Sequence, residues 1–181
     1  MKTFKLSSPF IFDTDCISAF LWVKRLDIPE GEFPGKIKIP DQVMAELANL
    51  KKFSAYSWVP NLLEAKIKDH TYERLVIPAS GPLAEEYIKL LRKMGSGEAA
   101  ALSLVKHLGG TVVSSNLRDV KEYCDNNGLE LIKTGDILCM AVINGRLSEA
   151  DGQIIWTNMK KARRRLPDYD FSEELKRFKA E

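Results

Sequence analysis

The sequence has little of the chemistry on which many enzymes depend. It contains two histidines and three cysteines in 181 residues, and Cys16, Cys124 and Cys139 are at spacings that match no zinc-binding pattern. Because the number of cysteines is odd, we expect reduced thiols in a cytoplasmic protein rather than a disulfide framework. His70 and His107 are expected to be ordinary surface residues.

Long apolar runs are also missing. No stretch approaches the ~20 residues that a membrane-spanning helix needs, and the N-terminus has no signal-peptide pattern. The net charge is only +2, so any contact with nucleic acid has to come from a local basic patch. Apolar residues make up 45% and charged residues 29%, which is typical of a globular domain. We expect one α/β domain over residues 1–166 and a C-terminal helical tail over 167–181.

Two kinds of apolar pattern alternate along the chain. Short apolar runs predict strands, and apolar residues at helical spacing predict helices between them. The strands are expected at 9–13, 36–40, 74–77, 111–115 and 129–132. Because the helices between them have lengths that suit β–α–β crossovers, the fold class is a three-layer α/β/α domain with a central parallel sheet of about five strands. We expect a strand order near 3-2-1-4-5.

The helices are expected at 13–25, 41–50, 62–68, 82–93, 98–107, 120–126, 137–144, from 148 or 151 to 165, and 172–179. The helical segments near 54–69 and 82–94 are expected to form a protruding hairpin. Ser96 and Asp136 are expected to cap the helices that follow them, because both residue types are favoured at that position.

Acidic side chains recur where the predicted strands end. Asp13 ends the first strand, Glu46 lies one turn into the second predicted helix, Glu98 begins an alanine-rich helix, and Asn116 and Asp119 follow the fourth strand. The carboxyl ends of parallel strands form the edge at which α/β proteins bind ligands. Carboxylates that converge there repel one another unless cations neutralise them. The pattern therefore predicts a Mg²⁺ or Mn²⁺ site, which suits phosphodiester hydrolysis.

Several motifs together resemble those of the PIN-domain family, the metal-dependent ribonuclease fold that includes the VapC toxins. The resemblance covers roughly residues 8–155 and is carried by Phe10-Ile11-Phe12-Asp13-Thr14-Asp15, Ile39-Pro40 with Val43 and Glu46-Leu47, Gly97-Glu98-Ala99-Ala100-Ala101-Leu102, Val112-Val113-Ser114-Ser115-Asn116-Leu117-Arg118-Asp119, Gly135-Asp136-Ile137-Leu138 and Asn144-Gly145-Arg146-Leu147.

The resemblance implies a Mg²⁺- or Mn²⁺-dependent endoribonuclease. Asp13, Glu46 and Glu98 would be the first three acids of its metal site, and Asp119 would join them as a catalytic residue. The implied partners are an RNA substrate, a small antitoxin protein that lies across the acids, and a second copy of the chain in a homodimer.

Asn116 departs from the family pattern, because the family usually has a fourth aspartate at this position. An amide oxygen can bind Mg²⁺ but brings no negative charge. Asp119, one helical turn further on, is the candidate that replaces it. An alternative interpretation is therefore a catalytically weakened module that binds RNA or a protein through the same crevice.

Six further residues are candidates for holding the substrate, through hydroxyl groups or positive charge: Ser114, Ser115, Arg118, Lys160, Arg163 and Arg164. Each has a structural alternative. Serines after a strand often satisfy backbone groups, and a basic run such as Lys160–Arg165 is typical of a solvated helix end. In the same way, Asp13 and Asn116 suit a helix cap and a turn.

A third interpretation is a phosphatase of the haloacid dehalogenase type, because Asp13-Thr14-Asp15 imitates its pair of aspartates. That chemistry also needs paired acids after a later apolar strand. Val113-Ser114-Ser115-Asn116 does not supply them, so the sequence favours the nuclease.

Overall fold

A five-stranded parallel sheet organises the chain, as the sequence predicts. The computed structural model describes residues 5–180. The strands are β1 (Phe10–Phe12), β2 (Ile37–Pro40), β3 (Glu73–Leu75), β4 (Thr111–Val113) and β5 (Glu130–Ile132). Their order is β3-β2-β1-β4-β5 and every neighbouring pair is parallel, so the predicted fold class and strand order are confirmed.

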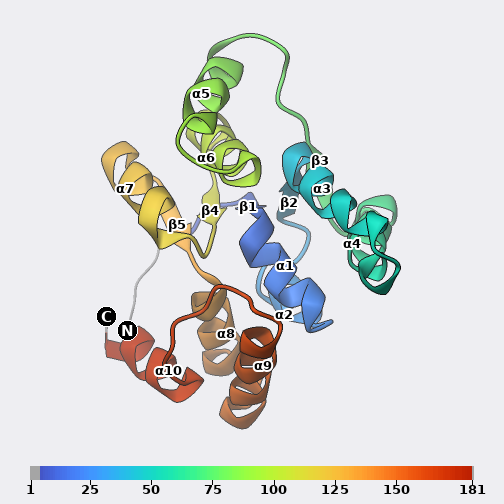
Figure 1. Ribbon diagram of the computed structural model, residues 1–181. Helices are drawn as coiled ribbons and strands as arrows, with labels where there is room; N and C mark the ends of the chain where they lie inside the picture. The colour runs from blue at the N-terminus through green and yellow to red at the C-terminus, as the bar shows by residue number, and fades with distance from the viewer. Residues whose placement is uncertain (1–4, 181) are drawn as a thin grey trace.

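Helices cover both faces of the sheet (Figure 1). Their bounds are α1 Thr14–Trp22, α2 Asp27–Glu32, α3 Asp41–Ala48, α4 Trp58–Lys68, α5 Pro82–Leu91, α6 Ser96–Leu108, α7 Leu117–Asn127, α8 Thr134–Ile143, α9 Glu149–Lys161 and α10 Phe171–Ala180, with 3₁₀ turns at Asn49–Lys52 and Ser54–Tyr56.

Alternate residues of β1 supply the two halves of the core, because successive side chains of a strand point to opposite faces. Phe10 and Phe12 pack with buried residues of α1, α2, α3, α4, α8, α9 and α10. Ile11 packs with α5, α6 and α7 on the other face. Both faces of the central strand are therefore buried. Asp13, the polar residue that follows this strand, lies between the two helical layers.

Two segments are helical where the sequence predicts a loop around Pro29 and a break at Trp58-Val59-Pro60, and both have the same explanation. Pro29 and Pro60 mark breaks in the sequence, but each occupies the first turn of a helix, α2 and α4. Proline is tolerated there because the amide N–H groups of the first turn have no partner within the helix. At both positions the proline therefore marks the beginning of a helix and not a loop.

The predicted hairpin of residues 54–69 and 82–94 is wrong. α5 packs mainly against α6, and α4 packs against α3 and α1. β3 lies between α4 and α5 in the sequence and pairs with β2 as an edge strand, which carries the chain from one face of the sheet toward the other. The α5–α6 pair forms the upper arm of the molecule in Figure 1.

The last long helix ends within the basic run Lys160–Arg165, which the sequence predicts to be helical throughout. α9 stops at Lys161, and Arg163 has a positive φ of 55°, which turns the chain out of the helix. Residues 162–170 then cross to α10, whose Phe171, Leu175 and Phe178 join the same core as β1. Arg163, Arg164 and Arg165 consequently lie on a connecting segment instead of a helix end.

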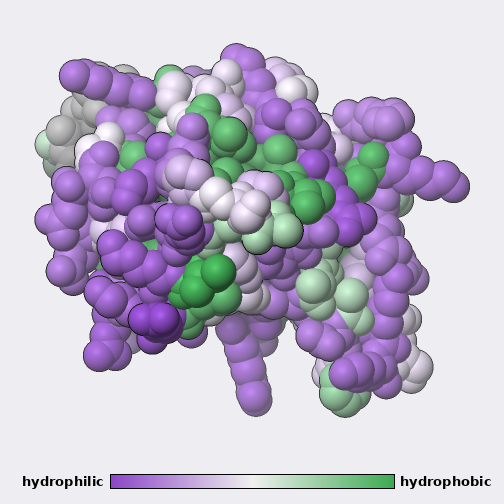
Figure 2. Space-filling view, turned by 90° about the horizontal axis from the view of Figure 1, so that it is seen from above, coloured by the Kyte–Doolittle hydropathy of each residue, from purple (hydrophilic) through white to green (hydrophobic). Residues whose placement is uncertain are grey.

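The remaining composition-based expectations concern the thiols, the histidines and the surface. All three cysteines are free and buried, and burial raises the pKa of each thiol, which makes them poor nucleophiles. Both histidines are exposed. No helix within residues 5–180 has the length and apolar character to cross a membrane. Figure 2 shows the molecule from above, where a mainly hydrophilic surface surrounds a hydrophobic patch.

Candidate functional site

An acid-lined cavity of about 280 Å³ lies beside the C-terminal ends of β1 and β4. Its walls come from α1, α3, α6, α7 and the segment after α9, and its lining residues are Thr14, Asp15, Glu46, Met94, Gly95, Glu98, Asn116, Asp119 and Arg165. The structure thus brings Glu46, Glu98, Asn116 and Asp119 to one place, as the position of the strand ends predicts.

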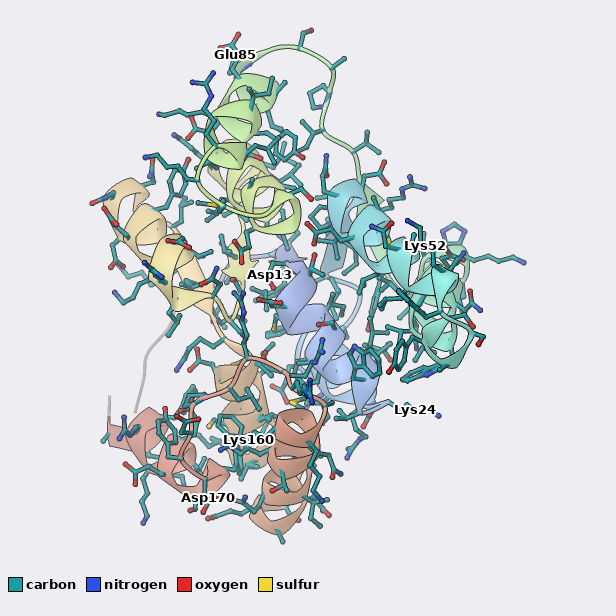
Figure 3. The ribbon with its side chains drawn as sticks, viewed as in Figure 1. Asp13, Lys24, Lys52, Glu85, Lys160 and Asp170 are labelled. Atoms are coloured by element: carbon teal, nitrogen blue, oxygen red, sulfur yellow. The ribbon has the colours of Figure 1, made fainter. Side chains whose placement is uncertain are left out.

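Asp13 is completely buried at the N-terminus of α1, in the middle of the molecule (Figure 3). Its Oδ1 accepts a hydrogen bond of 2.7 Å from the N–H of Cys16 and so caps the helix. Its Oδ2 is buried and accepts no hydrogen bond of good geometry. Capping therefore accounts for only one of the two carboxylate oxygens.

The surroundings of Asp13 disfavour its negative charge. Burial raises the pKa of Asp13 to about 7, and the neighbouring charges of Asp15 and Glu98 raise it further, whereas the Ser114 hydroxyl and the Cys16 N–H lower it. Thr14, the residue after Asp13, lines the same cavity as Glu98, so the end of the first strand and the start of α6 bring their acids to the same region. A buried carboxylate with a free oxygen and a raised pKa is typical of a functional site.

Glu46 is held by three hydrogen bonds that join α3 to two other helices. Its Oε2 accepts from the Thr14 hydroxyl, and its Oε1 accepts from the Ser96 hydroxyl and, at 2.9 Å, from the Gly97 N–H. Ser96 is therefore not the cap that the sequence predicts, because Gly95 occupies the cap position of α6. Glu46 fixes the start of α6, and thereby Glu98, relative to α1.

Glu98 and Asn116 contact each other directly across the cavity. The Asn116 Nδ2 donates a hydrogen bond of 2.7 Å to Glu98 Oε1. Since the amide uses its nitrogen in this bond, its oxygen remains available to a cation. Asn116 also occupies the cap position of α7, but its side chain makes no capping bond.

These donors fit a divalent ion that keeps most of its water. Among residues 5–180, no three acidic, histidine or cysteine side chains converge as a ready-made metal cage. Mg²⁺ and Mn²⁺ do not need one, because Mg²⁺ commonly binds through one or two carboxylates plus water and substrate phosphate. The free Oδ2 of Asp13, the carboxylate of Glu98 and the amide oxygen of Asn116 are oxygen donors of this kind.

The serines and Arg118 lie around the cavity rather than in it. Ser114 is buried, and its hydroxyl accepts from the Asn116 N–H at 3.2 Å. The Ser115 hydroxyl is 2.7 Å from that of Thr134. Arg118 and Asp119 are exposed in the first turn of α7, and Asp119 lines the cavity.

Two of the predicted basic residues make structural contacts, and the site contact is made by an arginine next to them. Lys160 donates to the backbone oxygen of Asp168 at 2.6 Å, and Arg164 donates to the Ser18 hydroxyl at 3.3 Å. Arg163 is exposed. Arg165, a member of the run that the sequence did not single out, reaches the acids instead, with 3.1 Å between its Nη1 and Asp15 Oδ2.

The family of the chain follows from comparison with known proteins. A family model described as a PIN domain (DUF3368) matches residues 9–180, which is nearly the whole chain. The chain belongs to the PIN-domain family. Members of this family are generally nucleases, and the match extends to the end of α10, beyond the part of the sequence that resembles VapC toxins.

A solved structure supports the same fold. The protein is similar to a chain in the crystal structure of DNA-bound VapBC from Salmonella typhimurium, with a TM-score of 0.55 and 19% sequence identity. The match covers 71% of this PIN domain and 99% of that chain. A comparison with curated proteins finds no match.

Sequence reasoning missed Thr14, Ser96 and Gly97 as parts of the site. A Cβ atom at Gly97 would lie 2.4 Å from Thr14 Oγ1 and 3.2 Å from Val43 Cγ2, so only glycine lets α6 approach α1 and α3 this closely. The available signal was the glycine directly before Glu98, since glycine within a helix is unfavourable unless close packing requires it.

Proposed function

We propose that this PIN domain is a Mg²⁺- or Mn²⁺-dependent endoribonuclease. The observation that carries the proposal is the completely buried carboxyl group of Asp13, whose Oδ2 accepts no hydrogen bond of good geometry even though the Ser114 hydroxyl is near, and which lies in the electrostatic field of Glu98. A cation beside this carboxyl group would favour its ionised form at neutral pH, which burial disfavours. Family membership supports hydrolysis of nucleic acid as the reaction.

Asp13, Glu98 and the Asn116 oxygen would hold the ion, and Asp119 would contact it through water. A bound divalent ion supplies charge neutralisation at phosphorus and activation of water. Glu46 has both oxygens engaged, so we assign it a positioning role: it keeps the first turn of α6 against α1 and so holds Glu98 beside Asp13.

The substrate strand would continue from the acid cavity into a second cavity of about 310 Å³ between α5, α6 and α7. Met94 and Asp119 line both cavities, so the two cavities adjoin each other. Lys89 and Lys93 line the second cavity and are exposed, and neither forms an ion pair with a described residue. Free lysines beside an acid site suit consecutive phosphates of a single strand.

Replacing Lys89 and Lys93 together with glutamine is expected to weaken binding of single-stranded RNA. Loss of two phosphate contacts lowers the slope of log Kd against log salt by about 1.4, because single strands contribute about 0.7 for each contact. Fluorescence anisotropy at several salt concentrations measures this slope. The matched control replaces Lys176 and Lys179 of α10, which line neither cavity. An equal slope in both double variants would contradict this path.

Asn116 also favours a second candidate function, a PIN domain that binds RNA or protein but cleaves weakly. Calorimetry with Mn²⁺ separates the two candidates, since the nuclease binds the metal below millimolar concentration and the binding module does not.

Replacing Asn116 with aspartate is expected to tighten Mn²⁺ binding about tenfold, because a second carboxylate adds charge within a few ångströms of the ion. The same change places two carboxylates 2.7 Å apart in metal-free protein, where the amide now donates to Glu98, and so lowers the melting temperature in chelator. Isothermal titration and thermal unfolding test both effects. Unchanged Mn²⁺ affinity would remove Asn116 from the metal site.

We also propose that the protein has an antitoxin as its partner. It is supported by the VapC-like motifs and by the fold shared with a chain of a VapBC complex. Co-expression with the product of an adjoining short reading frame tests it: a stable complex that suppresses cleavage supports the antitoxin, and independent purification of the two products opposes it.

The direct test of the nuclease is cleavage of labelled single-stranded RNA with Mg²⁺, with Mn²⁺ and with a chelator, using single-stranded DNA of equal sequence as comparison. Cleavage of RNA that stops in chelator and returns with added metal is the expected result. Cleavage that survives chelation, or cleavage of DNA alone, would overturn the assignment.

A further inference from the structure

Arg165 is the only cationic residue, within the described part of the chain, that lies at ion-pair distance from an acid of the cavity. Its Nη1 is 3.1 Å from Asp15 Oδ2 and 4.0 Å from Glu98 Oε1. The Arg165 side chain remains 61% exposed. The guanidinium therefore offsets negative charge at the opening of the acid-lined cavity, while much of the side chain remains exposed to solvent.

The segment that carries Arg165 is anchored on both sides. On one side, the Arg164 guanidinium lies 5.2 Å from the Trp22 ring centroid and donates to the Ser18 hydroxyl. On the other side, Lys160 and Trp156 donate to backbone oxygens of Asp168 and Tyr169, the latter at 2.9 Å. These contacts fix the backbone around Arg165, so the fold itself delivers this guanidinium to the acids.

The position of Arg165 conflicts with a divalent ion at the same carboxylates. Glu98 is a proposed ligand, and a guanidinium 4.0 Å from its Oε1 repels a second cation brought to that group. Because Arg165 is largely exposed, its ion pairs are weak and easily exchanged. A metal ion can therefore displace the side chain without moving its anchored backbone.

A displaced Arg165 still borders the cavity, because it forms a wall between two hollows. On its far side lies a mainly apolar cavity of about 310 Å³, to which Leu117, Leu166 and Pro167 contribute. A guanidinium at this boundary presents several N–H donors in the planar geometry that suits a phosphate group.

We propose that Arg165 has two states. Without metal, the Arg165 guanidinium pairs with Asp15 and Glu98 and acts as their counter-cation. With metal bound, it holds a phosphate of the RNA substrate. The second state rests on the proposed nuclease function, whereas the first depends only on binding of the ion.

The first state is tested by titrating Mn²⁺ into metal-free protein, with no RNA present. Arg165→Gln is expected to bind Mn²⁺ about two- to fivefold more tightly than the wild type, the range that corresponds to loss of an exposed ion pair. Arg165→Lys is expected to stay closer to the wild type, because it keeps the charge. Arg163→Gln, the same charge change two residues away without an acid partner among the described residues, controls for net charge. Equal affinities in Arg165→Gln and Arg163→Gln would overturn the first state.

The second state is tested by anisotropy of labelled single-stranded RNA in Mn²⁺ buffer. Arg165→Gln is expected to weaken RNA binding about tenfold or more, since it removes a charge-assisted hydrogen bond to phosphate. Arg165→Lys is expected to recover only part of this loss, because ammonium cannot bind phosphate in the bidentate manner. RNA affinity unchanged in Arg165→Gln would overturn the phosphate role. A wild type that binds RNA but never cleaves it would instead overturn the nuclease and leave both Arg165 measurements valid.

Discussion

Replacing Asp13 with asparagine is expected to lower metal-dependent RNA cleavage by about a thousandfold or more while making the metal-free protein more stable at pH 8. The change removes the charge that would hold the ion. It keeps the shape of the side chain and the Oδ1 atom that caps α1 through the Cys16 N–H. Loss of cleavage would therefore not be due to an unfolded α1.

The expected gain in stability follows from the raised pKa of Asp13. Its pKa is about 7 in the folded protein and 3.8 as the ordinary value, so the folded state binds more protons between these limits. Stability of the wild type consequently decreases as the pH rises from about 4 to about 7. Asparagine cannot ionise, so the variant does not lose this stability as the pH rises. After the cost of burying the amide donor is subtracted, we expect the free energy of unfolding at pH 8 to be about 1 kcal/mol or more higher than that of the wild type.

Urea denaturation in chelator at pH 5 and pH 8 measures this difference, and the cleavage assay measures activity. Asp125→Asn is the matched control, because Asp125 is an exposed acid that pairs with Lys121 away from the site. A variant that cleaves RNA as the wild type does would show that Asp13 is only a helix cap. Equal stabilities of Asp13→Asn and the wild type at pH 8 would show that Asp13 is not buried as a charge.

The sheet and its order are predictable from sequence because they depend on patterns that survive without tertiary context. Apolar runs such as Phe10-Ile11-Phe12 have no polar face, so they have to be buried on both sides. Alternation of strand and helix then restricts the connections to right-handed parallel crossovers. The convergence of Asp13, Glu98 and Asn116 follows from that topology alone.

Helix ends were less predictable, since they are decided by one or two residues. In a sequence, a proline is consistent both with a break and with the first turn of a helix. Only packing decides between these two structures at Pro29 and Pro60. The end of α9 depends on the positive φ of Arg163. This φ cannot be predicted from the sequence, because arginine has no preference for positive φ values.

The hydrogen-bond partners within the site were not predictable, because they depend on distances between helices. Glu46 is recognisable as a family acid, yet its engagement by Thr14, Ser96 and Gly97 requires α6 to lie closely against α1 and α3. Likewise, three consecutive arginines look alike in the sequence. Packing of Arg164 on Trp22 decides that Arg165 is the one directed at the acids.

The second large effect is expected from Gly97→Ala. Its new Cβ would lie 2.4 Å from Thr14 Oγ1, 3.0 Å from Glu46 Oε2 and 3.2 Å from Val43 Cγ2, so the start of α6 has to move outward. Overpacking of this kind costs about 1–3 kcal/mol of stability. Because Glu98 is the next residue, a shift of about 1 Å would also misplace a proposed metal ligand and lower cleavage about a hundredfold.

A double-mutant cycle with Thr14→Ala distinguishes this crowding from a general effect of alanine in the helix. Thr14→Ala alone loses the hydrogen bond to Glu46, but it also removes the atom nearest the new Cβ. Gly97→Ala is therefore expected to cost less in the Thr14→Ala background than in the wild type, in both urea denaturation and cleavage. Equal costs in the two backgrounds would mean that Thr14 does not set the approach of α6. In that case Gly97 would be required only for the geometry of its own helix turn, and the placement of Glu98 would depend on Glu46 and Val43.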